Sequence, residues 1–534
     1  MPRPPVGVFV SIRKVKAVTG FEAPVPLLPE ILALHGRWRA PRPAVICGDT
    51  TLDWRAFTAA NHRFAHGLLA RGVAPGDRVG VVMCNGLPMV QALFGTLAAG
   101  AVSVPINLSV SDAALVAMLV DAGISALVVS PDQQVRLTPL LAQLPDTLQL
   151  TLTSGAGDKH WTSLEALCAG QAETLPDAVR TLCPDAPLNI IYSSGTTGLP
   201  KGILHSHRTR RDWAYDLAIA LRYHGAARTL LTIGLYSNIS WVAMLCTVLA
   251  GGTLVLHERF DPAAFVATAA RERITHTAMV PIQFQRVVEQ LQAEGGDVSS
   301  LQAMMSCGSP LREGLKRDIF AYFPCGIIEL YGLTEGIITT LEPEDAEGRW
   351  ASVGRPLIGT DLRILDEDSR ELPHGVAGEI VSRGRISMPG YWRRDDANAE
   401  AEYIDAAGLQ WLRSGDIGYV DEEGFLYIVD RKKDMILSGG QNVYPQDIEA
   451  VLVQHAQVSD VAVIGIPSAR WGESPLALVV TTAGATTAEG ELLAWANARL
   501  GKQQRLAELK FVDDLPRNPN GKILKRELRM QFGE

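Results

Sequence analysis

The sequence lacks the features that mark secreted, zinc-binding or membrane-spanning proteins. Its 534 residues include seven cysteines, which are scattered without a CxxC pair. Such spacing favours reduced thiols in a cytoplasmic protein over a disulfide framework or a zinc site. The first residues contain no long apolar core followed by a cleavage site, so we expect no signal peptide.

Long apolar runs are scarce as well. The stretch most similar to a membrane span covers residues 89–108, but it follows Pro88 and is interrupted by Gly95, Gly100 and Pro105. A helix, a turn and a buried strand account for this pattern better than a spanning helix does. We therefore expect no transmembrane segment.

Charge of one sign is not in large excess. The chain has 49 Lys and Arg against 58 Asp and Glu, a formal net charge of −9. This balance argues against nucleic acid or an anionic membrane as the main partner. One basic cluster, residues 207–211, is interpreted as the solvated start of a helix. His205 and His207 have no further metal ligands nearby in the sequence and are interpreted as structural or ligand-positioning residues.

What the sequence does contain is typical of a globular protein. A chain of 534 residues is too long to fold around a single hydrophobic core, so we expect two or more domains. From residue 53 to 71 apolar residues recur at helical spacing, and Gly72 follows where the helix should end. Strand-like and helical patterns then alternate, which indicates an α/β fold with mainly parallel strands. The expected elements are strands at 77–83, 101–105, 126–129 and 253–256 and a helix at 89–99.

After about residue 355 the pattern changes to short strand-like runs punctuated by Gly, Asp and Pro. Residues 418–427 read as a β-hairpin, and we expect a β-rich subdomain over about 355–429. A dense charged stretch, residues 430–434, separates it from a final αβ segment of about 100 residues, a usual domain size.

The most informative segment is residues 193–202, Ser-Ser-Gly-Thr-Thr-Gly-Leu-Pro-Lys-Gly, which follows an apolar strand-like run at 188–192. Glycines allow backbone N–H groups to approach a polyphosphate, hydroxyls donate further hydrogen bonds, and Lys201 adds a positive charge. The segment is not a Walker loop, because no Gly precedes Lys201 and Gly202 follows where Ser or Thr should be.

Five segments in this order resemble the motifs of the AMP-forming acyl-CoA synthetases. These enzymes belong to the adenylate-forming superfamily, with peptide-synthetase adenylation domains and luciferases. Any one segment alone would be unremarkable, whereas all five in order make the resemblance specific. The segments are residues 192–202, 331–335 (Tyr-Gly-Leu-Thr-Glu), 414–416 (Ser-Gly-Asp), 430–445 and 516–522 (Pro-Arg-Asn-Pro-Asn-Gly-Lys).

The resemblance implies an N-terminal domain over 1–429, built from two layered α/β sheets and the β-rich subdomain, a hinge linker over 430–433 and a small mobile α+β C-terminal domain over 434–534. It also implies a reaction that converts a carboxylic acid, ATP and CoA to acyl-CoA, AMP and pyrophosphate through an acyl-adenylate, with Mg²⁺. Because adenylation joins two anions, cations and hydrogen-bond donors are needed along the phosphate path.

The resemblance assigns the nucleotide contacts residue by residue. Lys201 would hold the β- and γ-phosphates, Thr334 would hydrogen-bond near the α-phosphate, and Glu335 would bind Mg²⁺. Tyr331 would carry the adenine ring, and this role is compatible with core packing. The residues of the phosphate loop with the same implied role as Lys201 are Ser193, Ser194, Gly195, Thr196, Thr197 and Gly198.

The remaining implied roles concern ribose and catalysis. Asp416 would accept both ribose hydroxyls, Arg431 would reach the ribose or a phosphate, and Lys522 would bridge the attacking carboxylate and the α-phosphate. A rotation about Lys433 would then exchange Lys522 for a loop that lines the tunnel for the pantetheine thiol of CoA. The glycines of that loop are Gly439 and Gly440, which would permit close approach of a thin ligand or serve only a turn.

The acyl pocket is expected from segments 236–241, 306–309 and 336–338. Many related ligases carry a histidine after the aromatic residue of the first segment, but Ser237 follows Tyr236 here, which leaves substrate gating open. Amino-acid-activating domains place an aspartate at this position, and Ser237 cannot pair with a buried ammonium. We expect an uncharged tail: aliphatic, alicyclic or aromatic. The candidate pocket residues are Tyr236, Ser237, Trp241, Gly308, Ile337 and Ile338.

Two alternatives stay open beside the CoA ligase. The first is an enzyme that adenylates an acyl group or an amino acid and passes it to an acceptor other than CoA. The second is a non-catalytic homologue that binds nucleotide or acyl ligand, against which the intact lysines and carboxylates of the motifs argue. The sequence does not fix the acid, the pathway or the oligomeric state, for which a homodimer is one option.

Overall fold

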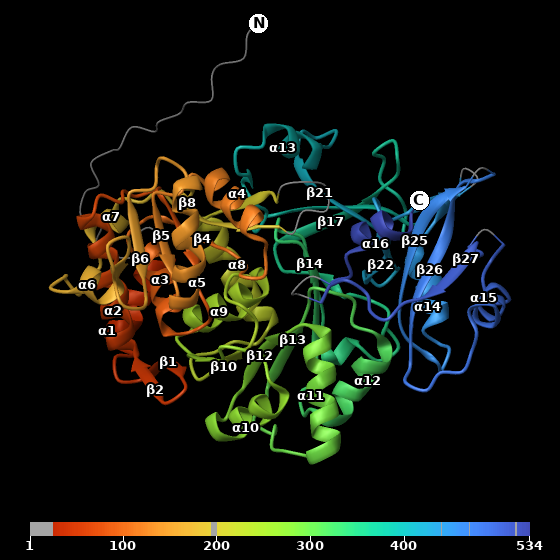
Figure 1. The fold of residues 1–534 in the computed structure, drawn as a ribbon, viewed down its shortest axis with the longest axis horizontal. Coiled ribbons are helices and arrows are strands. Elements are labelled where there is room, and N and C mark those ends of the chain that lie inside the picture. The colour runs from red at the N-terminus through yellow and green to blue at the C-terminus, as the bar shows by residue number, and fades with distance from the viewer. Residues whose placement is uncertain are drawn as a thin grey trace, which may run out of the picture.

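The computed structural model describes residues 25–193, 200–438, 441–468, 470–502, 504–517 and 521–533. Within them lie two large sheets of mainly parallel strands, a smaller antiparallel sheet and a separate C-terminal sheet (Figure 1). This architecture confirms the predicted α/β fold with a β-rich part after the parallel sheets.

The first large sheet has eight strands, and most of them run parallel to their neighbours. Strands β3 to β7 and β8 run parallel, while β9 and β19 add antiparallel at one edge. In sheet order the strands are β19 (Gly390–Tyr391), β9 (Gly202–Ser206), β8 (Pro187–Tyr192), β4 (Val102–Pro105), β3 (Arg78–Val82), β5 (Ala126–Val129), β6 (Leu150–Thr153) and β7 (Thr162–Ser163). The helices of this part are α1 (Leu28–Trp38), α2 (Trp54–Ala70), α3 (Leu87–Ala98), α4 (Asp112–Ala122), α5 (Pro131–Leu137), α6 (Leu164–Cys168) and α7 (Asp177–Arg180), with a 3₁₀ turn at Thr138–Gln143.

The second large sheet has nine strands. Its central strands are parallel, and β2, β15 and β16 pair antiparallel at the two edges. In sheet order they are β16 (Arg355–Pro356), β15 (Ile338–Leu341), β14 (Ile328–Gly332), β13 (Ala303–Ser306), β12 (His276–Met279), β10 (Arg228–Leu231), β11 (Thr253–Leu256), β1 (Pro43–Cys47) and β2 (Thr50–Asp53). The helices of this part are α8 (His207–Ala220), α9 (Asn238–Ala250), α10 (Pro262–Glu272), α11 (Pro281–Glu294) and α12 (Glu313–Tyr322), with a 3₁₀ turn at Pro343–Asp345.

One hydrophobic core joins the two large sheets. It contains Val81 from β3, Leu254 from β11 and apolar residues of α2, α3, α8 and α9. Residues 239–248 of α9 are all buried, and since most of them are apolar the helix can be enclosed on every side. The predicted helix at 53–71 and the predicted strand at 77–83 correspond to α2 and β3.

The β-rich part is a five-stranded antiparallel sheet that begins at Thr360. Its strands are β17 (Thr360–Leu365), β18 (Gly378–Gly384), β20 (Glu402–Ile404), β21 (Gln410–Val420) and β22 (Leu426–Arg431), with α13 (Asp395–Ala401) beside them. The expected hairpin is present, since Val420 of β21 pairs with Leu426 of β22. Strand β22 runs on through Arg431, into the predicted linker.

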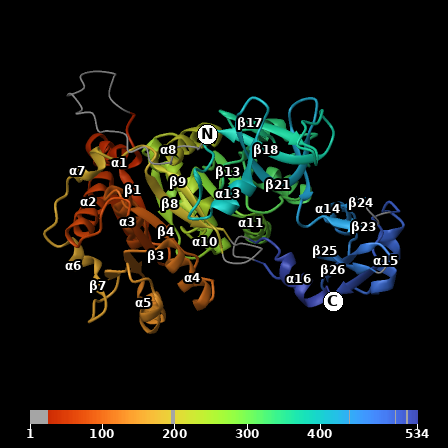
Figure 2. The same cartoon turned by 90° about the horizontal axis from the view of Figure 1, so that it is seen from above.

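The C-terminal segment has its own sheet and its own core. It lies at the end of the molecule opposite to α1 and α2 (Figures 1 and 2), and its core includes Ile448, Val463 and Leu492. The strands are β23 (Ile436–Ser438), β24 (Gln441–Val443), β25 (Val458–Ser468), β26 (Gly472–Thr481) and β27 (Glu508–Phe511), and the helices are α14 (Pro445–Leu452), α15 (Glu489–Asn497) and α16 (Lys525–Phe532).

The basic cluster at 207–211 starts helix α8 as predicted, but the prediction that it is solvated is wrong. Arg210 is 1% exposed; its Nε donates to Asn189 Oδ1 at 3.1 Å, and its guanidinium lies 4.5 Å from the centroid of the Trp213 ring. Burial lowers the pKa of Arg210 to about 9. The cation–π contact with Trp213 and the hydrogen bond to the Asn189 side chain offset part of the cost of burying this cation.

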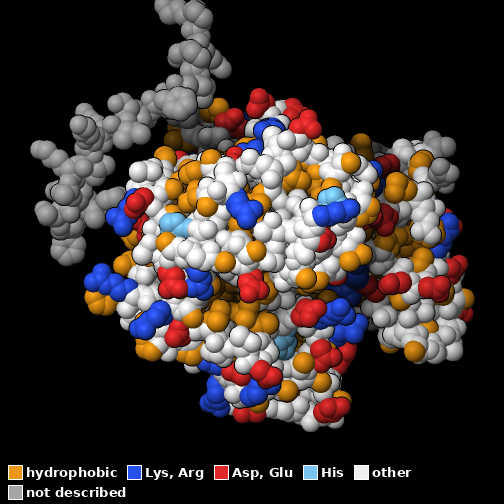
Figure 3. Space-filling model, turned by 60° about the vertical axis from the view of Figure 1, so that its left-hand side comes forward, with side chains coloured by type: hydrophobic (Ala, Val, Ile, Leu, Met, Phe, Trp, Pro, Cys, Tyr) orange, Lys and Arg blue, Asp and Glu red, His pale blue; other side chains and the backbone are white. Residues whose placement is uncertain are grey.

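The surface shows no large field of one charge sign on the face in Figure 3, where Lys and Arg alternate with Asp and Glu. Among the residues that the structure describes, no helix combines the length and apolarity needed to cross a bilayer.

Candidate active site

The residues predicted to bind ATP lie where β14 and β8 end. Tyr331 lies near the end of β14, and Thr334 and Glu335 follow in the next turn. Ser193 comes directly after the last residue of β8. Ligands of open α/β sheets bind at the carboxyl ends of parallel strands, so these positions are suited to a nucleotide.

Tyr391 connects the lysine of the phosphate loop to the predicted magnesium ligand. Its hydroxyl donates to Glu335 Oε1 at 2.9 Å, and its ring centroid lies 5.1 Å from Lys201 Nζ. Burial and the neighbouring carboxylate raise the pKa of Tyr391, which keeps the hydroxyl protonated as a donor. Burial also raises the pKa of Glu335. The backbone N–H of Met388 donates to the Glu335 carbonyl at 2.7 Å, so residues 388–391 hold Glu335 at both its backbone and its side chain.

Gly336 permits this close contact between two segments. Its φ is +120°, and a Cβ at this position would lie 2.5 Å from the Cα of Ser387. An L side chain would therefore be strained and would also collide with backbone. The glycine lets residues 386–388 pass beside Glu335.

The base of the phosphate loop is closed by backbone hydrogen bonds. The Ser193 N–H donates to the Lys201 carbonyl at 3.0 Å, and the Trp392 N–H donates to the Gly202 carbonyl at 2.7 Å. The first bond brings the two ends of the loop together, and the second holds the residue after the loop against Trp392. Seven residues with predicted ligand roles lie outside the described residues, and their roles stay predictions: Ser194, Gly195, Thr196, Thr197, Gly198, Gly439 and Gly440.

The predicted adenine and ribose residues are in direct contact. The Tyr331 hydroxyl donates to Asp416 Oδ2 at 2.7 Å, and Arg431 Nε lies 3.3 Å from Asp416 Oδ1. Asp416 and Arg431 face each other across the β21–β22 pair, and Asp416 is only 4% exposed. The sheet register therefore creates a buried, paired carboxylate next to an aromatic ring.

Lys522 belongs to the same neighbourhood although it comes from the C-terminal segment. Burial, with Arg431 and Lys433 nearby, lowers its pKa to about 7, while Asp416 and Asp434 act in the opposite direction. An ammonium enclosed by two other cations loses its proton more readily. The lysine therefore lies within electrostatic range of the carboxylate predicted to bind ribose.

The predicted hinge lies where the side-chain partners change from one segment to the other. Lys432 Nζ pairs with Glu379 of β18 at 3.0 Å, whereas Asp434 Oδ1 accepts from Arg529 of α16 at 2.9 Å. Lys433 stands between these two anchors, and burial lowers its pKa. A rotation of one segment relative to the other would concentrate its backbone change near this residue.

The predicted acyl-pocket residues surround the N-terminus of α9 and the ends of β13 and β15. Ser237 is the N-cap of α9, and its Oγ accepts from the Ile239 N–H at 3.4 Å. Trp241 is fully buried and its indole N–H donates to the Leu235 carbonyl at 3.0 Å. Ile337 and Ile338 are buried, Tyr236 is half-buried and Gly308 is exposed.

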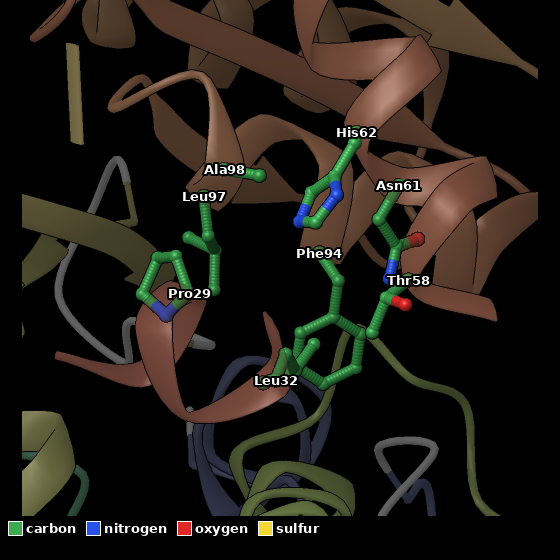
Figure 4. A pocket seen from close by; sticks show the side chains of 8 residues that line it. All are labelled: Pro29, Leu32, Thr58, Asn61, His62, Phe94, Leu97 and Ala98. Atoms are coloured by element: carbon green, nitrogen blue, oxygen red, sulfur yellow. The ribbon is translucent and has the colours of Figure 1, made fainter. Parts of the chain in front are cut away.

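A small cavity between α1, α2 and α3 is separate from this site (Figure 4). Its volume is about 10 Å³, room for about one water molecule. The amide group of Asn61 is buried at its wall, and neither amide atom has a hydrogen-bond partner among the described residues. The cavity is too small for an acyl chain.

The comparisons with known proteins agree with this geometry. The family model described as AMP-binding enzyme matches residues 35–392, and the one described as AMP-binding enzyme C-terminal domain matches residues 447–522. A feruloyl-CoA synthase of Amycolatopsis sp is 33% identical over 92% of this chain and 96% of its own length. The long-chain-fatty-acid–CoA ligase FadD13 of Mycobacterium tuberculosis is 32% identical over 91% of this chain and 94% of its own. The solved structure of o-succinylbenzoate-CoA synthetase from Bacillus subtilis with its acyl-adenylate intermediate superposes with a TM-score of 0.82 at 28% identity, covering 95% of this chain and 99% of that one.

The fold and the site define an adenylate-forming ligase, and the chain belongs to the AMP-binding enzyme family. The predicted activity is confirmed: the protein is an AMP-forming acid–thiol ligase that uses ATP and CoA and works through an acyl-adenylate.

Sequence reasoning missed Tyr391. The residue lies 56 positions from Glu335 along the chain, and a tyrosine between Gly390 and Trp392 looks like an ordinary core aromatic. Its only local signal is the Gly-Tyr-Trp run, which pairs as the edge strand β19 onto β9 directly after the phosphate loop.

Proposed function

We propose that the ligase activates a carboxylic acid with an uncharged tail, aliphatic, alicyclic or aromatic, in the cytoplasm. The observation that carries the substrate class is the neutral side chain of Ser237. A substrate with a charged tail would need a charged partner at this position, whereas the Ser237 hydroxyl caps helix α9 instead. Trp241 and Ile337 add buried apolar surface. All seven cysteines are unpaired, which supports a reducing compartment.

In the proposed first step, an oxygen of the substrate carboxylate attacks the α-phosphorus of ATP and pyrophosphate leaves. Lys201 holds the departing phosphates, Thr334 donates near the α-phosphate, and Lys522 bridges the two anions that react. Tyr331, Asp416 and Arg431 position the adenosine. In the second step the CoA thiol attacks the acyl carbon and AMP leaves.

The Glu335 carboxylate fits a magnesium ion. Mg²⁺ is usually bound by one or two carboxylates together with substrate phosphates. In the described part of the chain, no group of three or more His, Cys, Asp or Glu could hold a metal alone. The protein would therefore contribute Glu335 and the nucleotide most other ligands, and the ion would offset phosphate charge.

Between the steps we propose a rotation of residues 434–534 relative to 1–429, with the linker at 430–433 and its centre at Lys433. The opposite anchoring of Lys432 and Asp434 supports this position for the hinge. The rotation would withdraw Lys522 and bring the loop with Gly439 and Gly440 to the acyl-adenylate.

A test of the substrate class is AMP release from ATP and Mg²⁺ across a panel of acids, each with and without CoA. We expect CoA-dependent AMP release with uncharged aliphatic or aromatic acids. A clear preference for dicarboxylic acids would overturn the uncharged tail and would direct attention to the buried cation Arg210, 5.5 Å from the centroid of the Trp241 ring. Pyrophosphate release without CoA dependence would indicate another acceptor.

The pKa of Lys522 predicts a pH limb in the adenylation step. Only the protonated amine can bridge two anions, so kcat/KM for ATP should be maximal below pH 7 and fall as the pH rises through about 7. The measurement is acyl-adenylate formation without CoA across this range. The Lys522→Arg variant, which stays protonated, should lose the limb at a lower overall rate. A wild-type profile that is flat from pH 6 to 8.5, about one unit below to one and a half units above the expected pKa, would contradict the assignment.

The two contacts of Tyr391 can be separated by mutation. Tyr391→Phe keeps the ring beside Lys201 but removes the donor to Glu335, so the variant should need roughly 5- to 20-fold more Mg²⁺ for half-maximal ATP binding. Tyr391→Leu should in addition weaken ATP binding without Mg²⁺. Displacement of a fluorescent nucleotide at graded Mg²⁺ concentrations measures both effects. The matched control is Tyr403→Phe, which removes a tyrosine hydroxyl that donates to the Ser369 carbonyl away from the site. An unchanged Mg²⁺ requirement in Tyr391→Phe would refute the role.

A further inference from the structure

A chain of polar contacts connects the N-terminal domain to the residue next to Lys522. Arg312, the N-cap of α12, places its Nη2 3.0 Å from Asp460 Oδ1 in β25. The other carboxylate oxygen of Asp460 pairs with Arg517. Arg517 Nη1 donates at 2.5 Å to the carbonyl of Gly521, which immediately precedes Lys522. The chain thus runs from one domain through a single carboxylate to the catalytic lysine.

Asp460 is the central group of this chain. Each of its oxygens serves one arginine, and its side chain is 20% exposed. The carboxylate offsets the repulsion between two guanidinium groups that converge on it from different domains. Without it, Arg312 and Arg517 would face each other as like charges, which disfavours the observed docking.

An apolar contact supports the same arrangement. A Cβ at Gly521 would lie 3.6 Å from Cγ2 of Ile282 on α11, so the backbone beside Lys522 passes close to the N-terminal domain. Ile282 is 44% exposed, so this apolar contact is partly open to solvent. The contact between the two domains at this point therefore depends on the small apolar contact at Ile282 and on the ion pairs of Asp460.

We propose that Asp460 is a positioning residue for adenylation. Its two ion pairs hold the C-terminal domain, and with it Lys522, in the arrangement that makes the acyl-adenylate, and both the contact to Arg312 and the support of Lys522 must break before thioester formation. This inference rests on the proposed rotation about Lys433. Asp460 touches no reacting atom and acts through Arg517 and Gly521.

The expected effects are moderate and differ between the two half-reactions. One exposed ion pair changes an equilibrium by roughly two- to fivefold. Arg312→Ala should slow acyl-adenylate formation by about this factor, and Asp460→Asn, which removes both pairs, by roughly tenfold. Thioester formation from supplied acyl-adenylate and CoA should stay unchanged or become faster, because the competing arrangement is weakened.

The experiment measures both half-reactions in the full-length protein for wild type, Arg312→Ala, Asp460→Asn, Asp460→Glu and the Arg312→Ala/Asp460→Asn double variant. Arg317→Ala is the matched control, since Arg317 is on the same helix but pairs with Glu313 of that helix. We expect the double variant to be no slower than Asp460→Asn, Asp460→Glu to recover part of the adenylation rate, and Arg317→Ala to match wild type.

Added salt gives a readout that a merely structural role would not change. Salt screens exposed pairs, so it should shift the ratio of the two half-reaction rates in wild type and much less in Asp460→Asn. Equal loss of both half-reactions, or no change in either, would overturn the proposal. Equal loss of both half-reactions in Lys522→Ala, measured in the same assays, would refute the domain rotation itself.

Discussion

The Lys522→Ala variant will lose acyl-adenylate formation by roughly 10²–10³-fold yet convert supplied acyl-adenylate and CoA to acyl-CoA at the wild-type rate. The amine lies in a buried neighbourhood of Asp416, Arg431 and Lys433, where the nucleotide is proposed to bind. A positive charge fixed there stabilises the transition state in which two anions meet. The thioester step joins a thiol to an acyl group already activated, and in the proposed rotation it takes place after Lys522 has withdrawn.

Two measurements decide this prediction. Pyrophosphate release without CoA reports adenylation, and AMP release from supplied acyl-adenylate with CoA reports thioester formation. Lys510→Ala is the control, since Lys510 lies in the same domain and pairs with Glu508 at the surface. If Lys522→Ala loses both half-reactions equally while Lys510→Ala keeps both, the proposed rotation of the C-terminal domain between the two half-reactions is wrong for this protein.

The sequence predicted the architecture well where a local period carries the information. Helix α2 shows helical spacing of apolar residues and ends before Gly72, and β3 is a short apolar run bounded by turn residues. The burial of Arg210 could not be predicted in this way. Trp213 is three residues further along the same helix, but Asn189 and Trp241 come from a strand and another helix that meet α8 only in the folded layer. The local charge pattern therefore suggested solvent instead.

The same distinction applies to the site. Tyr331, Asp416 and Arg431 each occur in a recognisable motif, and the structure brings the three into contact. Asp460 carries no such signal, because it is 148 residues from Arg312 and 57 from Arg517 along the chain. Its meaning depends on how two domains are docked, and no periodicity within one segment encodes that arrangement.

The Asp416→Asn variant will raise KM for ATP roughly 10- to 100-fold, since hydrogen bonds to a charged group are the stronger ones. Asparagine can still accept from the Tyr331 hydroxyl, but it removes the negative charge opposite Arg431. The ribose hydroxyls would then meet a weaker acceptor. Because Asp416 also raises the pKa of Lys522, the variant should lower that pKa and move the pH limb of adenylation below pH 7.

This second effect separates a role in the site from a role in the fold. Asp421→Asn is the matched control, because Asp421 lies in the turn of the same β21–β22 hairpin and accepts from the Phe425 N–H at 2.9 Å. Damage to the hairpin would affect both variants, whereas only Asp416→Asn can alter the electrostatic field at Lys522. A pH limb that remains at about 7 in Asp416→Asn would show that Lys522 and Asp416 do not share one site, and the placement of the catalytic lysine beside the ribose carboxylate would then be wrong.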